Sequence, residues 1–211
     1  NQVKENAHSG VGQLVGRSIW PHCFHLCTAH SVLYRVIQNL AEDGGGCGDS
    51  WKAHWQFKLA NRLTQRVVGV SHDAARLCQQ QDPGSRDKIT TIWNGINLDR
   101  FIYHGPKPTP TAISVARLST IKDFPTLLRA VRLVRPHLPD FRLRIVGDGP
   151  ERPTLETLID ELNLRSHVEL LGERHDVPKL LAESGFFVSS SLSEGISLTL
   201  LEAMAVGLPV V

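Results

Sequence analysis

The second half of the chain alternates short apolar runs with segments of helical periodicity. The apolar runs predict strands at 112–116, 141–146, 167–171, 186–190 and 209–211. The segments between them predict helices near 123–136, 152–163, 176–184 and 198–206. Short apolar strands separated by amphipathic helices are typical of α/β domains with a doubly wound parallel sheet. We therefore expect residues 106–211 to form such a domain.

In two of these helices the sequence has residues that favour a helix N-terminus. Asp123 stands where the first helix needs an N-cap, and Pro125 occupies its first turn. Ser197 is placed to cap the last helix. The apolar residues of the first helix fall on one face, which predicts that this face packs on the sheet.

The first half is less regular. Strand character is present in HLCTAHS and in RVVGVS (66–71), and a Gly-rich loop covers 41–50. The segment ITTIWNGINLDRF (89–101) predicts a strand followed by an Asn-Gly turn, and 104–110 has the composition of a linker. A helix is predicted where apolar residues recur every four positions, and we expect its apolar stripe to face the core; the stripe consists of Trp51, Trp55, Leu59 and Leu63. This gives two domains, 1–105 and 106–211.

Composition excludes several classes of protein. The 211 residues carry a formal net charge of only +2, and Lys and Arg are dispersed, so nucleic acid is not an expected partner. No apolar run reaches the ~20 residues that span a bilayer. The first ten residues are polar and do not resemble a signal peptide. The chain starts without Met and stops at Pro209-Val210-Val211, which begins a strand, so we expect both ends to be incomplete.

Four cysteines do not make a disulfide scaffold, and they favour a reducing cytosolic setting. The segment HCFHLCTAH places Cys23 and Cys27 among three histidines, His22, His25 and His30. Such spacing can bind zinc, but a second Cys-x-x-Cys pair is lacking and alternate strand residues face opposite ways. Buried thiols are the favoured interpretation, and we expect no metal site.

Ligands of doubly wound sheets bind beyond the carboxyl ends of the strands, so the residues after each strand are the candidates. Arg117 and Lys122 follow the first strand, and two cations beside free backbone N–H groups suit a diphosphate. Two solvated surface charges are the alternative. The sequence GDGP (147–150) is not a dinucleotide fingerprint, because Arg152 stands where the third glycine belongs.

The stretch SEGISLTLLEAMAVGLPVV (193–211) contains two carboxylates, Glu194 and Glu202. Gly195 would let the backbone approach a ligand closely. Glu202 interrupts the apolar pattern of its helix, and a carboxylate in a cleft can accept hydrogen bonds from the hydroxyls of a ribose. An ordinary exposed helical Glu would show the same spacing.

These residues complete a resemblance to the retaining GT-B glycosyltransferases of family 4, the glycosyl transferases group 1. Six segments match in the order of that family, and together they cover about residues 66–211: VVGVS, ITTIWNGINLDRF, SVARLSTIKDFPTLLRAV, LRIVGDGPER, HVELLGE and SEGISLTLLEAMAVGLPVV. The most diagnostic feature is the pair Glu194 and Glu202, separated by seven residues. Two departures are Ala116 and Ser197, where the family often has Gly.

The resemblance implies a fold of two Rossmann-like lobes. Residues 1–105 would form part of the N-terminal, acceptor-side lobe, and 106–211 a truncated C-terminal lobe that binds the nucleotide-sugar donor. In that lobe the resemblance implies that Arg117 and Lys122 hold the donor diphosphate, Glu202 binds the ribose, and Glu173 and Arg174 lie beside the base.

The resemblance further implies catalytic roles for Glu194 and His30. Glu194, with the backbone of Gly195, Ile196, Ser197 and Leu198, would face the donor sugar and phosphates. His30 would approach the sugar from the N-terminal lobe. No metal or other cofactor is implied, and the chain has no Asp-x-Asp motif that could hold one.

The implied activity is transfer of a sugar, with retention at the anomeric carbon, to a glycan or lipid-linked acceptor in polysaccharide or glycolipid assembly. The implied location is the cytoplasm, at the inner face of the membrane. Family members often touch membranes through the N-terminal lobe, although no basic amphipathic helix here indicates this. We expect poor turnover from this chain alone, because the family's chain continues past residue 211.

Three alternatives remain. A glycoside hydrolase could use Glu194 and Glu202 as acid and nucleophile, but it has no need of Arg117 and Lys122. A nucleotide-sugar epimerase shares the GT-B fold. A non-catalytic nucleotide-sugar-binding module would keep the same donor residues and lack turnover.

Overall fold

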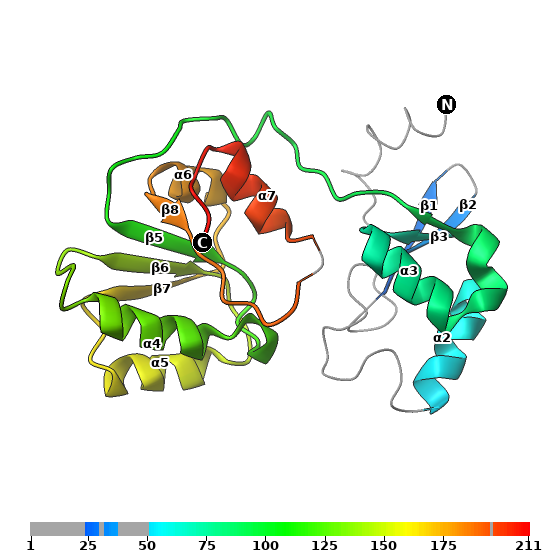
Figure 1. Cartoon of the computed structure of the whole chain (residues 1–211), viewed down its shortest axis with the longest axis horizontal. Helices are drawn as coiled ribbons and strands as arrows, with labels where there is room; N and C mark the ends of the chain where they lie inside the picture. The colour runs from blue at the N-terminus through cyan, green and yellow to red at the C-terminus, as the bar shows by residue number, and fades with distance from the viewer. Residues whose placement is uncertain (1–23, 30–31, 38–50, 195) are drawn as a thin grey trace. The chain divides into compact units, whose positions relative to one another are not determined.

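The computed structural model describes residues 24–29, 32–37, 51–194 and 196–211. The chain forms two compact units (Figure 1). Unit 1 contains the residues up to Gly95 together with Glu194–Ile196. Unit 2 contains Ile96–Ser193 and Ser197–Val211.

Unit 2 is built on a parallel sheet. Its four strands pair in the order β7-β6-β5-β8, where β5 is Thr111–Val115, β6 Arg142–Val146, β7 Val168–Gly172 and β8 Phe186–Phe187. Beyond β8, Val210 forms a parallel bridge with Phe187, and the Phe187 N–H donates to the carbonyl of Pro209 (2.8 Å). The predicted strands at 112–116, 141–146, 167–171 and 186–190 correspond to β5, β6, β7 and β8, and the one predicted at 209–211 forms a single bridge at Val210.

Helices cover both faces of this sheet, as the alternation predicted. One layer contains α4 (Phe124–Val134) and α5 (Arg152–Glu161), and the other α6 (Val177–Ala182) and α7 (Leu198–Ala205) (Figure 1). Asp123 and Ser197 cap α4 and α7, accepting from the N–H groups of Thr126 (3.4 Å) and Leu200 (3.4 Å). None of the helices in the described residues is long and apolar enough to cross a membrane.

Strand residues alternate between two cores. Ala112, Leu143 and Ile145 pack with the buried residues of α4 and α5. Ile113, on the opposite face, packs with those of α6 and α7. Burying a side chain of this size stabilises the fold by about 1.5–3 kcal/mol. The two cores fix the strand ends, and with them the loops that follow.

Unit 1 is a mixed sheet in the order β1-β2-β3-β4. Its strands are β1 (Phe24–Ala29), β2 (Val32–Ile37), β3 (Arg66–Gly69) and β4 (Ile89–Thr91), and its helices are α2 (Trp51–Leu63), α3 (His72–Gln81) and the 3₁₀ helix η2 (Pro83–Lys88). The strand β1 is antiparallel to β2, and the others run parallel. The strands predicted in HLCTAHS (25–31), in RVVGVS (66–71) and within 89–101 are confirmed as β1, β3 and β4, whereas β2 and α3 were not predicted.

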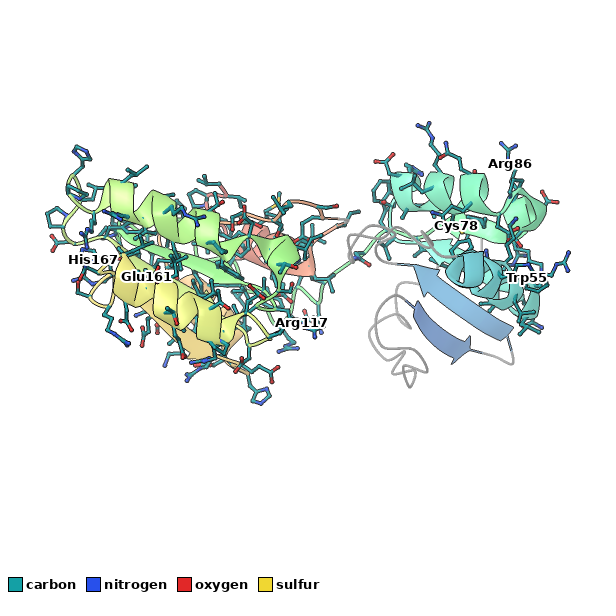
Figure 2. The ribbon with its side chains drawn as sticks, turned by 90° about the horizontal axis from the view of Figure 1, so that it is seen from below. Trp55, Cys78, Arg86, Arg117, Glu161 and His167 are labelled. Atoms are coloured by element: carbon teal, nitrogen blue, oxygen red, sulfur yellow. The ribbon has the colours of Figure 1, made fainter. Side chains whose placement is uncertain are left out.

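The prediction that the Trp/Leu stripe of α2 faces the core is wrong. Trp55 is 63% exposed and Leu63 69% exposed, and Figure 2 shows Trp55 on the surface of the unit. The buried face instead carries Phe57 and the polar residue Asn61, and Thr64, which follows the helix, is also buried. Asn61 donates to the carboxylate of Asp82 (2.9 Å), and this bond makes its burial favourable. The buried face of α2 thus includes a polar residue whose hydrogen-bond partner is distant in sequence, and apolar spacing does not predict this.

The segment 96–105, assigned to the first domain from sequence, packs in unit 2. Phe101 is 6% exposed and belongs to the core beneath α6 and α7. The N–H of His104 donates to the carbonyl of Val206 (3.0 Å). In the structure the units part between Gly95 and Ile96, before the Pro-rich stretch that suggested a linker.

We expect Gly149→Ala to destabilise unit 2 by about 1–3 kcal/mol, because the new Cβ would lie 2.3 Å from the carbonyl oxygen of Leu118. The matched control is Gly95→Ala, whose Cβ would meet nothing within 4 Å. Urea unfolding followed by circular dichroism measures both free energies. Equal stabilities of the two variants would contradict the packing described here.

Candidate functional site

An open pocket of ≈500 Å³ lies where three strand-following loops meet. Its lining comes from the loops after β5, β6 and β7: Arg117, Gly147, Asp148, Gly149 and Glu173. Figure 2 shows Arg117 and His167 at opposite ends of unit 2, consistent with Arg117 following β5 and His167 preceding β7. We call this the edge pocket, and it occupies the position where doubly wound sheets bind ligands.

Backbone hydrogen bonds hold these loops together. The Leu118 N–H donates to Asp148 (3.0 Å), and the Gly147 N–H donates to Gly172 (2.8 Å). Gly147 has φ 131°, and a Cβ there would lie 2.0 Å from the carbonyl oxygen of Ala116. Only glycine allows so close an approach, so GDGP makes a tight strand-to-helix turn.

Arg117 is held in the edge pocket by its neighbours. The next residue, Leu118, is fully buried, and it anchors the loop in the core of α4 and α5. The Arg117 side chain is exposed and faces the same pocket as Glu173. The structure thus brings together two of the predicted site residues, one cationic and one anionic.

Lys122 ends the 3₁₀ helix η3 (Thr120–Lys122), which leads into α4. Its carbonyl accepts a hydrogen bond from the Ser190 hydroxyl (2.8 Å), and the Leu192 N–H donates to Ile121 (2.9 Å). These bonds tie the loop after β8 to the loop before α4. Lys122 therefore lies in a segment that is hydrogen-bonded to the residues between β8 and α7.

Arg174 differs from Glu173 in its surroundings. Its guanidinium forms two parallel hydrogen bonds with the carboxylate of Asp176 (2.8 and 2.9 Å). This pairing raises the pKa of Arg174 and lowers the pKa of Asp176. This pair uses two of the five N–H donors of the Arg174 guanidinium.

Glu202 is a half-buried carboxylate on α7. Burial raises its pKa above the ordinary value for Glu, and the nearby positive charge of Arg100 opposes the shift in part. Ser197 and Leu198 lie at the N-terminus of the same helix, where Leu198 is 41% exposed. A carboxylate kept partly out of water beside a cation is a feature that often marks functional sites.

The remaining predicted residues lie elsewhere or are not described. Glu194 is exposed and groups with Ile196 in unit 1, where the Asn94 side chain donates to the Ile196 carbonyl (3.0 Å). Gly195 and His30 lie outside the described residues, as do His22 and Cys23 of the Cys/His segment. Across the described ranges, no group of three or more His, Cys, Asp or Glu could hold a metal ion.

Sequence reasoning missed two residues of this region. Asp148 lines the edge pocket and pairs with Arg152 (3.5 Å). Its position in GDGPER, directly after a predicted strand, could have identified it as a candidate. Arg100, whose charge acts on Glu202, gave no signal, because it was assigned to the other domain.

Comparison with known proteins gives a consistent result. The family model for glycosyl transferases group 1 matches residues 96–211. The putative colanic acid biosynthesis glycosyltransferase WcaL of Escherichia coli K12 is 37% identical over 140 residues, covering 60% of this chain and 34% of that protein. An Escherichia coli UDP-Gal:α-D-GlcNAc-diphosphoundecaprenol α-1,3-galactosyltransferase is 29% identical over 170 residues, covering 74% of this chain and 44% of that protein. The chain thus spans about a third of WcaL and under half of the galactosyltransferase.

Among solved structures, that of Anabaena HepE in complex with UDP-glucose matches with a TM-score of 0.70 and 22% identity. The match covers 83% of this chain and 51% of HepE, and it shows the GT-B fold. Because the family model covers more than half of the sequence, the chain belongs to the glycosyl transferases group 1 family.

Proposed function

We propose that the protein is a retaining glycosyltransferase whose unit 2 binds a nucleoside-diphosphate sugar. The observation that carries the proposal is the edge pocket, which places Arg117 at the carboxyl ends of parallel strands in a member of this family. At such an edge, glycines let a phosphate come close to the backbone, and backbone N–H groups donate hydrogen bonds to its oxygens. The relatives named above include a galactosyltransferase that uses UDP-Gal, which supports the donor class.

Arg117 and Lys122 act on the donor diphosphate in this proposal. Cleavage of the bond between the sugar and its phosphate oxygen leaves negative charge on the departing nucleoside diphosphate. Cations fixed beforehand stabilise that charge without reorganising in the transition state. Their positive charge also fulfils the role of a metal ion, so we propose that transfer requires none.

Glu202 binds the ribose hydroxyls, and Glu173 with the backbone of Arg174 borders the base. We assign Glu194 and residues 195–198 to the donor sugar and phosphates, and we assign His30 a catalytic role. The roles of Glu194 and His30 rest on the family resemblance.

The acceptor in this proposal is a glycan or a lipid-linked saccharide. The support is that WcaL is named for colanic acid biosynthesis and that the galactosyltransferase acts on a diphosphoundecaprenol-linked sugar. A lipid-linked acceptor would bring the enzyme to the cytoplasmic face of a membrane.

Arg117→Ala and Lys122→Ala should each weaken nucleotide binding about tenfold, since a charge-assisted hydrogen bond contributes about 1.5–3 kcal/mol and exposure reduces it. Isothermal titration calorimetry with UDP, GDP and ADP in turn measures the affinity. Arg132→Ala, on an exposed position of α4, is the matched control. If all three variants bind like the unsubstituted chain, the assignment of the diphosphate is wrong.

Glu202→Gln should raise stability and weaken nucleotide binding. The folded-state pKa of Glu202 is above its unfolded value, so ionising this carboxyl costs stability. The cost is absent below the ordinary pKa of about 4.3 and complete above the raised pKa. The stability advantage of Glu202→Gln over the unsubstituted chain should therefore grow as pH rises from about 4 to about 7.

Nucleotide affinity should show the opposite trend. The ionised carboxylate accepts the ribose hydroxyls, so affinity of the unsubstituted chain should fall as pH drops through the raised pKa, and that of Glu202→Gln should not. Thermal unfolding and nucleotide titration across this pH range test both trends. Glu161→Gln, on an exposed position of α5, should change neither property. An affinity that falls equally with pH in both proteins would remove Glu202 from the site.

The complete gene product should form a product with the same anomeric configuration as the donor, and EDTA should not reduce its rate. Proton NMR of the product reports the anomeric coupling constant. Inversion would contradict the retaining assignment, and loss of activity with EDTA would contradict metal independence. Donor binding without transfer to acceptor or water would favour the non-catalytic module.

A further inference from the structure

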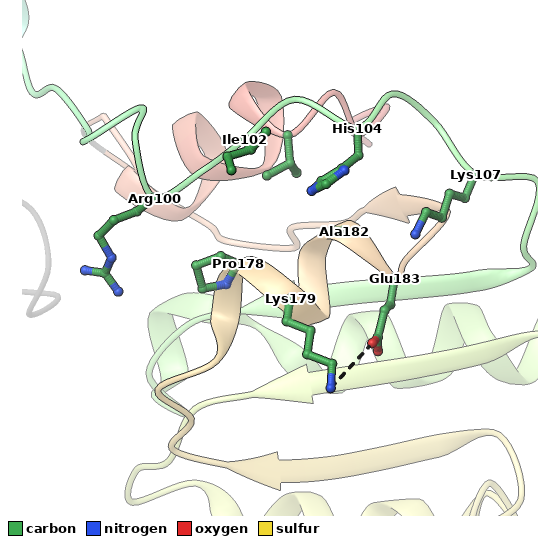
Figure 3. A pocket seen from close by; sticks show the side chains of 9 residues that line it. Arg100, Ile102, His104, Lys107, Pro178, Lys179, Ala182 and Glu183 are labelled. Atoms are coloured by element: carbon green, nitrogen blue, oxygen red, sulfur yellow. Dashed lines mark ion pairs between the residues drawn. The ribbon is translucent and has the colours of Figure 1, made fainter.

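A second pocket of unit 2, ≈350 Å³ in volume, lies between residues 100–107 and helix α6 (Figure 3). We call residues 100–107 the strap. The lining residues of this strap pocket include none of those that line the edge pocket. The strap pocket is therefore a separate feature of the same unit.

The fold holds the strap in place. Phe101 is buried in the core beneath α6 and α7, and the His104 N–H donates to the carbonyl of Val206 at the end of α7 (3.0 Å). Gly207 has φ 86°, and a Cβ there would lie 2.4 Å from the ring of Tyr103. These contacts hold the strap against unit 2, so this wall of the strap pocket is fixed.

Basic side chains dominate the strap pocket. Arg100, His104 and Lys107 come from the strap, and Lys179 comes from α6. The single acidic residue in the lining is Glu183, whose carboxylate is already shared by Lys179 (4.0 Å) and Arg144 (3.6 Å). Among the described residues, no carboxylate forms a salt bridge with Arg100 or Lys107. The pocket thus has an excess of positive charge.

The remaining lining is apolar and consists of Ile102, Pro178, Ala182 and Val206. Ile102 is 63% exposed. Cations above an apolar surface suit a ligand that combines an anionic group with an organic body. Figure 3 shows His104 and Lys107 of the strap facing α6, whereas Lys179 lies on α6 beside its partner Glu183. Phosphate, which offers several acceptor oxygens and up to two charges, fits this arrangement better than a single carboxylate.

We propose that the strap pocket binds an organic phosphate, either a soluble phosphate ester or the phosphate headgroup of a lipid. This proposal goes beyond the proposed glycosyl transfer and uses none of the residues assigned to the donor. Arg100 also acts on Glu202, so the tests leave Arg100 unchanged.

The direct test follows the imidazole signals of His104 by NMR while the chain is titrated with glycerol 3-phosphate. The His104→Gln variant assigns the signals. We expect a saturable shift, and we expect Lys107→Ala to weaken the affinity about tenfold and Lys179→Ala about threefold. Neutral glycerol should cause no shift, and Arg132→Ala should bind like the unsubstituted chain. A shift that never saturates, or an unchanged affinity in Lys107→Ala, would overturn the proposal.

A second arm separates the two sources of phosphate. Co-sedimentation compares phosphatidylcholine vesicles with and without phosphatidic acid. Binding that requires phosphatidic acid and is lost in Lys107→Ala indicates a lipid headgroup. Binding of glycerol 3-phosphate without vesicle binding indicates a soluble ester, and binding of neither overturns the proposal. Lys107→Ala should leave UDP affinity unchanged, so failure here is distinct from failure of the donor site.

Discussion

The close approach of two loops at the carboxyl edge of the unit 2 sheet shapes the edge pocket, on which the proposed donor site depends. Gly147 and Gly149 let the loop after β6 lie against the carbonyl groups of Ala116 and Leu118. Side chains at either position would push the loops apart. The packing directs Arg117 into the edge pocket, because its neighbour Leu118 is fully buried in the core. The position of the cation thus follows from a backbone constraint rather than from a charge partner.

At Glu202 the proposed function and the stability of the fold would oppose each other. Its carboxyl is half-buried on α7, where burial raises its pKa and the charge of Arg100 offsets that effect only in part. A Gln or Leu at this position would be easier to accommodate in the fold. A carboxylate whose ionisation costs stability is consistent with a role in binding hydroxyl groups. The same Arg100 lines the strap pocket, so its charge acts both there and on Glu202.

Features that depend on residues close together in the sequence were predicted correctly, whereas features that depend on distant residues were not. Asp123 and Ser197 cap their helices through bonds to residues three positions away, so local pattern sufficed. The buried face of α2 was misassigned because Asn61 is satisfied by Asp82, 21 residues distant. Arg100 reaches Glu202 across an even longer separation, which no local pattern encodes. The strand-following loops were predictable as candidates because parallel-sheet geometry alone brings them together.

A crystal structure of the 211-residue chain with bound UDP would show where unit 2 binds the nucleotide. We expect diphosphate oxygens within hydrogen-bonding distance of Arg117 and Lys122, with the ribose hydroxyls on the carboxylate of Glu202. A diphosphate bound elsewhere in unit 2, for example in the strap pocket, with the edge pocket unoccupied, would contradict this expectation.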